Sequence, residues 1–305
     1  MTSDQSTERT GTVFDIGYQT YEGEREGRRR AWQTIFWDSA KNGMGIGRGG
    51  WAKILPWLVV SPAILAGLVF AAIAAFFEQL NIEADNGEGA NPIDLPGHQD
   101  LVGVIGFLLL IFAAFVGPEL ICPDRRNRVI HLYFVRPITL LDYLGARWLA
   151  FVALLLAASL LPHITLWVGL LIGVSDALGH IQDNWTDIPR FVGNSAVFAV
   201  FAASFTFAVS SLTDRRMIAT LIVISVIMIS SFAELIVNLF EPPDAVSDPI
   251  ALVDLIGINT SVIPAIFFGN YDQNFDLNIF IPVAWVILLT TGSIFATWRF
   301  YSRQR

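Results

Sequence analysis

Cysteine and charge are both scarce in this sequence. Cys122 is the single cysteine, which excludes an intramolecular disulfide and a metal site built from several thiolates. Charged residues make up 15% of the chain and hydrophobic residues 54%, and the mean hydropathy is +0.56. Soluble globular domains are about 25% charged. The composition therefore indicates that lipid surrounds much of the chain.

The sequence signatures of an enzyme are also missing. A nucleotide-binding P-loop requires G-x-x-x-x-G-K-[ST], and no such run occurs. Residues 45–50 match G-x-G-x-x-G, but a lipid span follows them and the required strand is missing, which favours a hinge over a dinucleotide site. His180 with Asp183 and His98 with Asp100 are two isolated pairs, which do not make a catalytic centre. We therefore expect neither catalytic residues nor a metal site.

Long apolar runs take up most of the sequence after residue 53. A helix needs roughly 20 apolar residues to cross hydrocarbon about 30 Å thick, because all its backbone polar groups must be satisfied internally. Six runs meet this demand: 54–77, 101–121, 148–174, 191–212, 217–240 and 279–298. We predict an all-α polytopic membrane protein with six transmembrane helices. We expect residues 1–51 to form a cytoplasmic N-terminal segment without a cleavable signal peptide, and residues 52–305 to form the transmembrane domain.

The basic residues predict the orientation of these spans. The formal net charge is -8, which argues against a nucleic-acid partner. However, if the N-terminus is cytoplasmic, 18 of the 19 Lys and Arg residues fall on the cytoplasmic side, and Arg190 is the exception. The positive-inside rule expects this bias. We therefore predict a multi-pass protein of the cell membrane with both termini in the cytoplasm.

Residues 251–269 are apolar but interrupted by polar and helix-breaking residues. Asp254, Gly257, Asn259 and Pro264 divide the run, and a seventh span here would move the basic C-terminus outside. We predict a re-entrant or interfacial helical hairpin on the outer side, before the last span. Such broken backbone is tolerated at membrane depth only where protein covers it.

An amphipathic helix is expected before the first span. Trp32, Ile35, Phe36 and Ser39 have the i, i+3, i+4, i+7 spacing of one helix face, and three arginines at residues 28–30 precede them. This pattern suits a helix in the headgroup layer. The helix is expected to be a surface anchor beside the first span, or to contact a cytoplasmic partner as well.

The loop 122–147, between the second and third spans, is too long and too apolar for a solvated turn. Pro123 and Pro137 punctuate it. Asp124 suits the N-cap of a short helix, and Thr139 suits the cap of another before Tyr143. A short helix with a charged start and an apolar middle suits docking into a groove on another protein.

Several residues around this loop resemble those of ABC-2 type permeases, the membrane-spanning subunits of type V ABC transporters. The likeness rests on the order of Glu119, then Asp124-Arg125-Arg126, then Arg136-Pro137, then Tyr143-Leu144-Gly145-Ala146-Arg147. Arg147 stands where that family usually has lysine. Six spans, an amphipathic N-terminal helix and an outer hairpin are also similar to that family, so the resemblance covers nearly the whole chain.

The resemblance implies that residues 123–143 couple the spans to a separate cytoplasmic ABC ATPase. That subunit would bind ATP and Mg, so this chain would carry no cofactor and no ATPase site. A second copy or a related permease would complete the path, with export as the implied direction. The coupling residues would be Asp124, Arg125, Arg126, Arg128, Arg136 and Pro137. The alternative is that these arginines are topology signals that contact lipid headgroups.

Two acidic residues and one histidine fall within the predicted spans. Glu119 is expected to pair inside the bundle, and Glu234 to snorkel or pair with the hairpin rather than handle substrate. His163 follows Pro162 and is expected to serve packing. Two other functions stay open: a membrane scaffold or sensor that docks an ATPase without transport, and a secondary transporter, for which the spans lack ionisable residues near the midplane.

Overall fold

The computed structural model describes residues 27–47, 49–84, 97–129, 133, 138–173, 177–240, 252–269 and 278–303, and in them the chain is helical without a strand. The helices run through α1 (Gly27–Gly43), α2 (Gly50–Ala84), α3 (His98–Arg126), α5 (Leu140–Gly173), α6 (Ala177–Asp183), α7 (Asp187–Ser210), α8 (Arg216–Asn238), α10 (Leu255–Gly257), η1 (Ile258–Val262), α11 (Ile263–Phe268) and α13 (Phe280–Ser302). The all-α prediction is confirmed for these residues.

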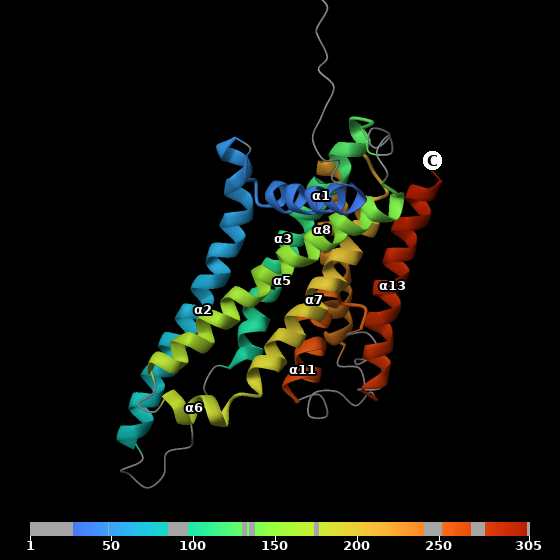
Figure 1. Cartoon of the computed structure of the whole chain (residues 1–305). Helices are drawn as coiled ribbons and strands as arrows, with labels where there is room; N and C mark the ends of the chain where they lie inside the picture. The colour runs from blue at the N-terminus through green and yellow to red at the C-terminus, as the bar shows by residue number, and fades with distance from the viewer. Residues whose placement is uncertain are drawn as a thin grey trace, which may run out of the picture.

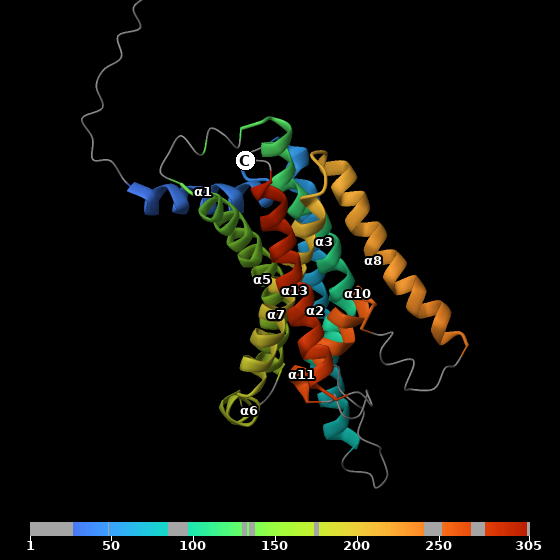
Figure 2. The same ribbon diagram turned by 90° about the vertical axis from the view of Figure 1, so that its right-hand side faces the viewer.

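Five of the described helices are long and apolar enough to cross a membrane: α2, α3, α5, α7 and α13. They run along one bundle axis in Figure 1, as expected of a multi-pass membrane protein. The sixth expected span, 217–240, is α8, whose described apolar part, Arg216–Phe232, is shorter. Figure 2 shows α8 leaning away from the other helices.

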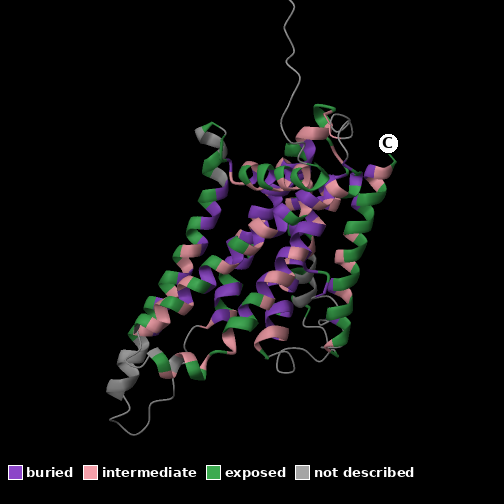
Figure 3. Ribbon diagram, viewed as in Figure 1, coloured by how far each residue is buried: buried purple, intermediate pink, exposed green. Residues whose placement is uncertain are grey.

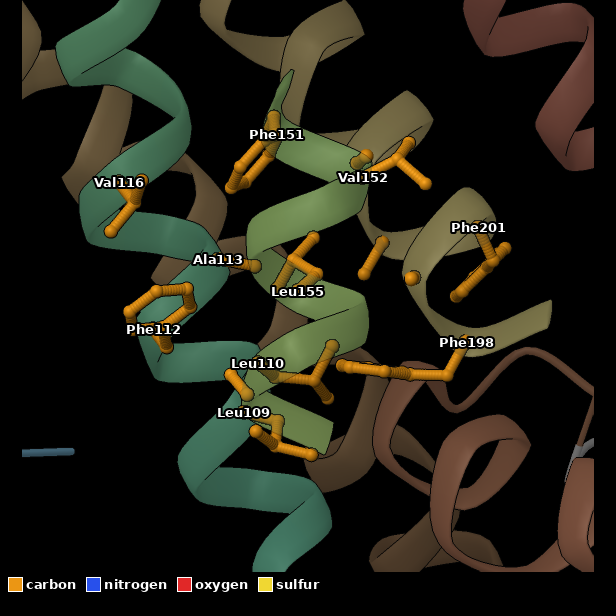
Figure 4. Packing of buried hydrophobic residues seen from close by; sticks show 14 of the residues in the cluster. Leu109, Leu110, Phe112, Ala113, Val116, Phe151, Val152, Leu155, Phe198 and Phe201 are labelled. Carbon is orange, nitrogen blue, oxygen red and sulfur yellow. The ribbon is translucent and has the colours of Figure 1, made fainter. Parts of the chain in front are cut away.

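The centre of the bundle is formed by α3, α5 and α7. About two-thirds of the apolar window of α3 is buried, at 67%, against 17% for α13, so α13 lies at the edge. Figure 4 shows Phe151 and Leu155 of α5 beside α3 and α7. Buried residues gather at this centre in Figure 3, whereas the outer faces of α2 and α13 are exposed. Because lipid is as apolar as these side chains, the association of α3, α5 and α7 is favoured by close packing rather than by the exclusion of water.

Small residues bring α2 and α5 into close contact. A Cβ at Gly67 would overlap the Thr165 hydroxyl and the Pro162 carbonyl, and a Cβ at Gly169 would overlap Ala71. Gly67 and Ala71 are four residues apart on α2 and therefore share one face. This small-xxx-small arrangement is typical of helix pairs packed within a membrane.

The N-terminal helix prediction matches α1, which crosses one end of the bundle (Figure 1). Ile35, Ser39 and Gly43 are its buried residues, and the helix packs against α5 and α3. The expected apolar stripe therefore faces the chain's own transmembrane helices.

The described part of the predicted hairpin is one helix rather than two arms. Residues 255–268 run continuously through α10, η1 and α11, and the middle part is a π-helix. The Asp254 carboxylate caps this helix by accepting hydrogen bonds from the backbone N–H groups of Ile256 and Gly257. Gly269 ends it with a φ of 83°, in the left-handed region that glycine tolerates. Pro264 is the second residue of α11, which follows the π-helix directly, so it stands where the regular hydrogen-bond ladder of an α-helix is already interrupted.

Candidate functional site

Most of the basic residues lie at one end of the bundle, which we call the basic end. It comprises α1, the end of α3, the start of α5, the turn between α7 and α8, and the end of α13 (Figures 1 and 2). The 29 residues of α3 rise roughly 44 Å, more than the hydrocarbon thickness of about 30 Å. Asp124, Arg125 and Arg126 lie in the last turn of α3, beyond the predicted apolar run 101–121, and Arg128 follows the helix.

Asp124 joins the end of α3 to the start of α5. Its carboxylate accepts hydrogen bonds from the Tyr143 hydroxyl, at 2.7 Å, and from the Arg147 guanidinium. Arg147 also donates to the Leu120 carbonyl, lies 4.9 Å from the Tyr143 ring centre and is only 7% exposed in its side chain. The prediction that Asp124 begins a short helix is wrong, because α3 continues through Pro123 to Arg126. Asp124, Tyr143 and Arg147, three of the residues that carried the resemblance, therefore form an internal network.

Arg125 makes its contacts within the chain as well. Its side chain is 7% exposed and forms an ion pair of 2.6 Å with Asp214. It also donates to the Ser211 carbonyl and lies 4.9 Å from the Phe300 ring centre and 5.6 Å from that of Tyr301. Within the chain, Arg125 therefore joins α3 to the α7–α8 turn and to α13, while its role in coupling stays a prediction.

Cys122 lies in the same junction and is fully buried. Its sulfur is 3.7 Å from the Ser210 carbonyl oxygen and 3.5 Å from that of Thr213. The turn between α7 and α8 therefore covers the thiol.

Glu119 joins α3 to α8. Arg216, the first residue of α8, donates to its carboxylate at 2.6 Å. The Glu119 side chain is 16% exposed and that of Arg216 is 59% exposed, so the pair lies at the edge of the bundle. Glu234 belongs to α8, but its side chain lies outside the part of the chain that the structure describes.

A bidentate ion pair connects α1 with α5. Arg28 donates two hydrogen bonds of 2.8 Å to Asp142, and these bonds raise the pKa of the Arg28 guanidinium above its ordinary value. Asp142 also accepts from the backbone N–H and hydroxyl of Thr139, while the Thr139 hydroxyl accepts from the N–H of Asp142. This reciprocal pattern is a capping box. Thr139 thus caps a helix as expected, but that helix is the long α5 itself.

Arg126 and Arg128 differ from Arg125 because both side chains are exposed, and neither forms an ion pair with another described residue. Arg128 has a φ of 54° and is the one non-glycine described residue with a positive φ. The Val129 N–H donates to the Asp124 carbonyl and the Arg128 N–H to the Arg125 carbonyl, both at 3.1 Å. These bonds form a Schellman motif, in which glycine usually takes the position of Arg128. Backbone strain of this kind is often kept for function.

A cavity of about 390 Å³ opens between α1 and the segment that follows α3. It is lined by Ala31, Thr34, Ile35, Asp38, Val129, Tyr133, Ile138 and Arg147.

Arg136 and Pro137 are the remaining predicted coupling residues. Both lie outside the described residues, so their placement stays a prediction.

At the opposite end, the structure brings together two histidines that the sequence keeps 65 positions apart. The Nδ1 atoms of His98 and His163 are 3.1 Å apart in a buried site beside the rings of Phe191 and Phe268. His163 does serve packing, but its pairing with His98 could not be read from the sequence, because no local motif links α3 to the middle of α5. Among the described residues, no group of three potential metal ligands occurs.

Comparison with known proteins found no matching family model and no matching curated protein. The similarity to ABC-2 type permeases therefore rests on the residues of this chain.

Proposed function

We propose that the chain is the membrane-spanning permease subunit of an ABC transporter of the ABC-2 type. The basic end faces the cytoplasm and docks on a separate ABC ATPase, which binds ATP and Mg. The observation that carries the proposal is the outward position of Arg126 and Arg128 at the end of α3, with Arg128 held in a conformation that costs an arginine free energy.

The contacts of α3 supply a route for mechanical coupling. Its last two turns are joined to α5 through Asp124 and Arg147, to α8 through Glu119 and Arg216, and to α13 through Arg125. A displacement of residues 126–129 by the ATPase therefore shifts three other helices. ATP binding would favour one of two arrangements of the spans, and the useful free energy is the difference in substrate affinity between them.

The same proposal assigns the remaining elements their positions relative to the membrane. In it, α8 is the sixth span, α1 lies in the headgroup layer, and residues 251–269 form the re-entrant element at the outer end, where α10, η1 and α11 pack against α3, α7 and α8. Both termini are cytoplasmic, and the membrane is the cell membrane. A second copy or a related permease pairs with this chain to enclose the path, and export is the direction that the resemblance implies.

The test is co-purification from the native cell in mild detergent. The tagged chain should retain a subunit with a P-loop whose ATP hydrolysis depends on this chain. Arg128→Glu should reduce retention strongly, because it reverses the charge of an exposed side chain on the proposed docking surface. Arg190→Glu, an equal charge change at the opposite end, is the control and should retain the ATPase fully. If no P-loop subunit is retained, or both variants behave alike, the docking role is wrong.

A further inference from the structure

Two buried histidines meet at the end of the bundle opposite the basic end. His98 is the first residue of α3 and is 7% exposed, and His163 of α5 is fully buried. Their Nδ1 atoms are 3.1 Å apart. Phe191 of α7 stacks on His163 with 5.6 Å between ring centres, and Phe268 of α11 stacks on His98 at 6.4 Å. The pair therefore joins α3 to α5 where four helices meet.

The contact between the two Nδ1 atoms limits how many protons the pair can hold. A hydrogen bond between two ring nitrogens needs a hydrogen on one of them and a lone pair on the other. Two neutral rings meet this condition, and so does a pair with one extra proton, because that proton can bind at Nε2. With two extra protons both Nδ1 atoms carry hydrogen, so the bond is lost and two positive charges face each other with ring centres 5.3 Å apart. The closed pair therefore holds one proton fewer than two separated imidazoles.

The described residues around the pair offer little to balance two positive charges. Neither Nε2 atom has a hydrogen-bond partner among them. The part of α5 around the pair and all of α11 contain no Asp, Glu, Lys or Arg, and α2 contacts this part of α5 through small uncharged residues. On α7, Asp187 is near enough to attract a charge on His98, but it is paired with Arg190 at 3.2 Å. On α3, the Asp100 carboxylate accepts a hydrogen bond from the backbone at the start of its own helix.

We propose that this pair makes the contact between α3 and α5 sensitive to acid. The contact persists while the two imidazoles carry at most one extra proton, and it separates when both are protonated. Histidine suits this role because its side chain ordinarily titrates near pH 6.5, within the physiological range. In the proposed topology this end faces the outside of the cell, so an acidic exterior favours its opening. The inference itself requires only the packing of α3 against α5, and it stands or falls separately from ATPase docking.

Asparagine separates hydrogen bonding from titration at this site. Its amide lies near the position of Nδ1 and can both donate and accept, so His163→Asn can pair with His98 in either protonation state. His98→Asn is the reciprocal variant. The control is His131→Asn with His180→Asn, which removes the other two of the four histidines and leaves the pair intact.

The measurement is the labelling of a cysteine placed beside the pair in the purified full chain in detergent. Leu101 is fully buried on α3, three residues after His98, so a thiol there reacts only when α3 separates from its neighbours. Leu101→Cys in a Cys122→Ser background is treated with a dipyridyl disulfide between about pH 7.5 and about pH 5. Because separation takes up one proton, the labelling rate below about pH 6.5 should rise about tenfold per pH unit relative to His163→Asn at the same pH. The control with only the paired histidines should show the same rise.

The proposal is wrong if the labelling rate follows the same course with pH in the chain with the pair and in the asparagine variants. It is also wrong if the control loses the rise, and this result decides the question even where neither asparagine variant folds. If Zn²⁺ slows labelling at neutral pH in the chain with the pair but not in His163→Asn, the two histidines form a metal site instead.

Discussion

Because Arg128 has a left-handed backbone conformation, substitutions at this position can test its effect on the stability of the chain separately from its effect on ATPase docking. Arg128→Gly and Arg128→Ala both remove the guanidinium, but only alanine keeps a Cβ in the left-handed region. That region costs a residue with a Cβ about 1–2 kcal/mol. Glycine loses about 0.5–1 kcal/mol more conformational entropy on folding than alanine. Glycine at position 128 should therefore be more stable than alanine by roughly 0.5–1 kcal/mol.

The matched position is Arg126, which is exposed but helical, in the last turn of α3. At position 126 the alanine variant should be the more stable of the two, because glycine in a helix is about 1 kcal/mol less favourable than alanine. Thermal or denaturant unfolding of the four variants in one detergent measures both differences. A less stable Arg128→Gly than Arg128→Ala would refute the Schellman geometry at the end of α3.

The same variants address function. Arg128→Gly should lose ATPase retention as strongly as Arg128→Ala, even though glycine makes the folded chain more stable. A glycine variant that keeps full retention would refute the docking role of the side chain and leave the strain without a functional reason.

Two further predictions concern the packing of the bundle. Asp124→Asn should lower the free energy of unfolding by about 3 kcal/mol, because it leaves the buried Arg147 without a countercharge. Asp187→Asn, which unpairs the 45%-exposed Arg190, should cost less than about 1 kcal/mol in the same unfolding assay, and equal effects would contradict the burial argument. Gly67→Val should destabilise the chain by about 1–3 kcal/mol through overlap between α2 and α5, whereas Gly103→Val, at a site with no atom within 4 Å of the new Cβ, should be nearly neutral in thermal unfolding; a neutral Gly67→Val would argue against the close contact.

The sequence was sufficient for the location of most apolar helices, because the length of a span follows from the thickness of the lipid layer; six spans were predicted, and five of the described helices are long and apolar enough to cross a membrane. It was insufficient at the ends of those helices. The end of the apolar run in α3 marks where lipid ends, but the backbone hydrogen bonds continue to Arg126. Hydropathy alone carries no information about that extension.

The partners of Asp124 and Arg125 were missed for a related reason. Asp124 follows a proline and therefore looks like a helix cap, but Tyr143 and Arg147, 19 and 23 positions away, hold its carboxylate. Arg125, Arg126 and Arg128 look equivalent in sequence. Only the direction in which each side chain leaves the helix separates the buried Arg125 from the two exposed arginines.

The burial of Cys122 gives the protein a built-in reporter. As the sole thiol in the chain, it can be tagged by a maleimide without any background signal. The reagent reaches the sulfur only when the segment around Ser210 and Thr213 moves off α3. The labelling rate of the unmodified protein, with and without nucleotide and the proposed ATPase, would thus report how fast the α7–α8 turn separates from α3.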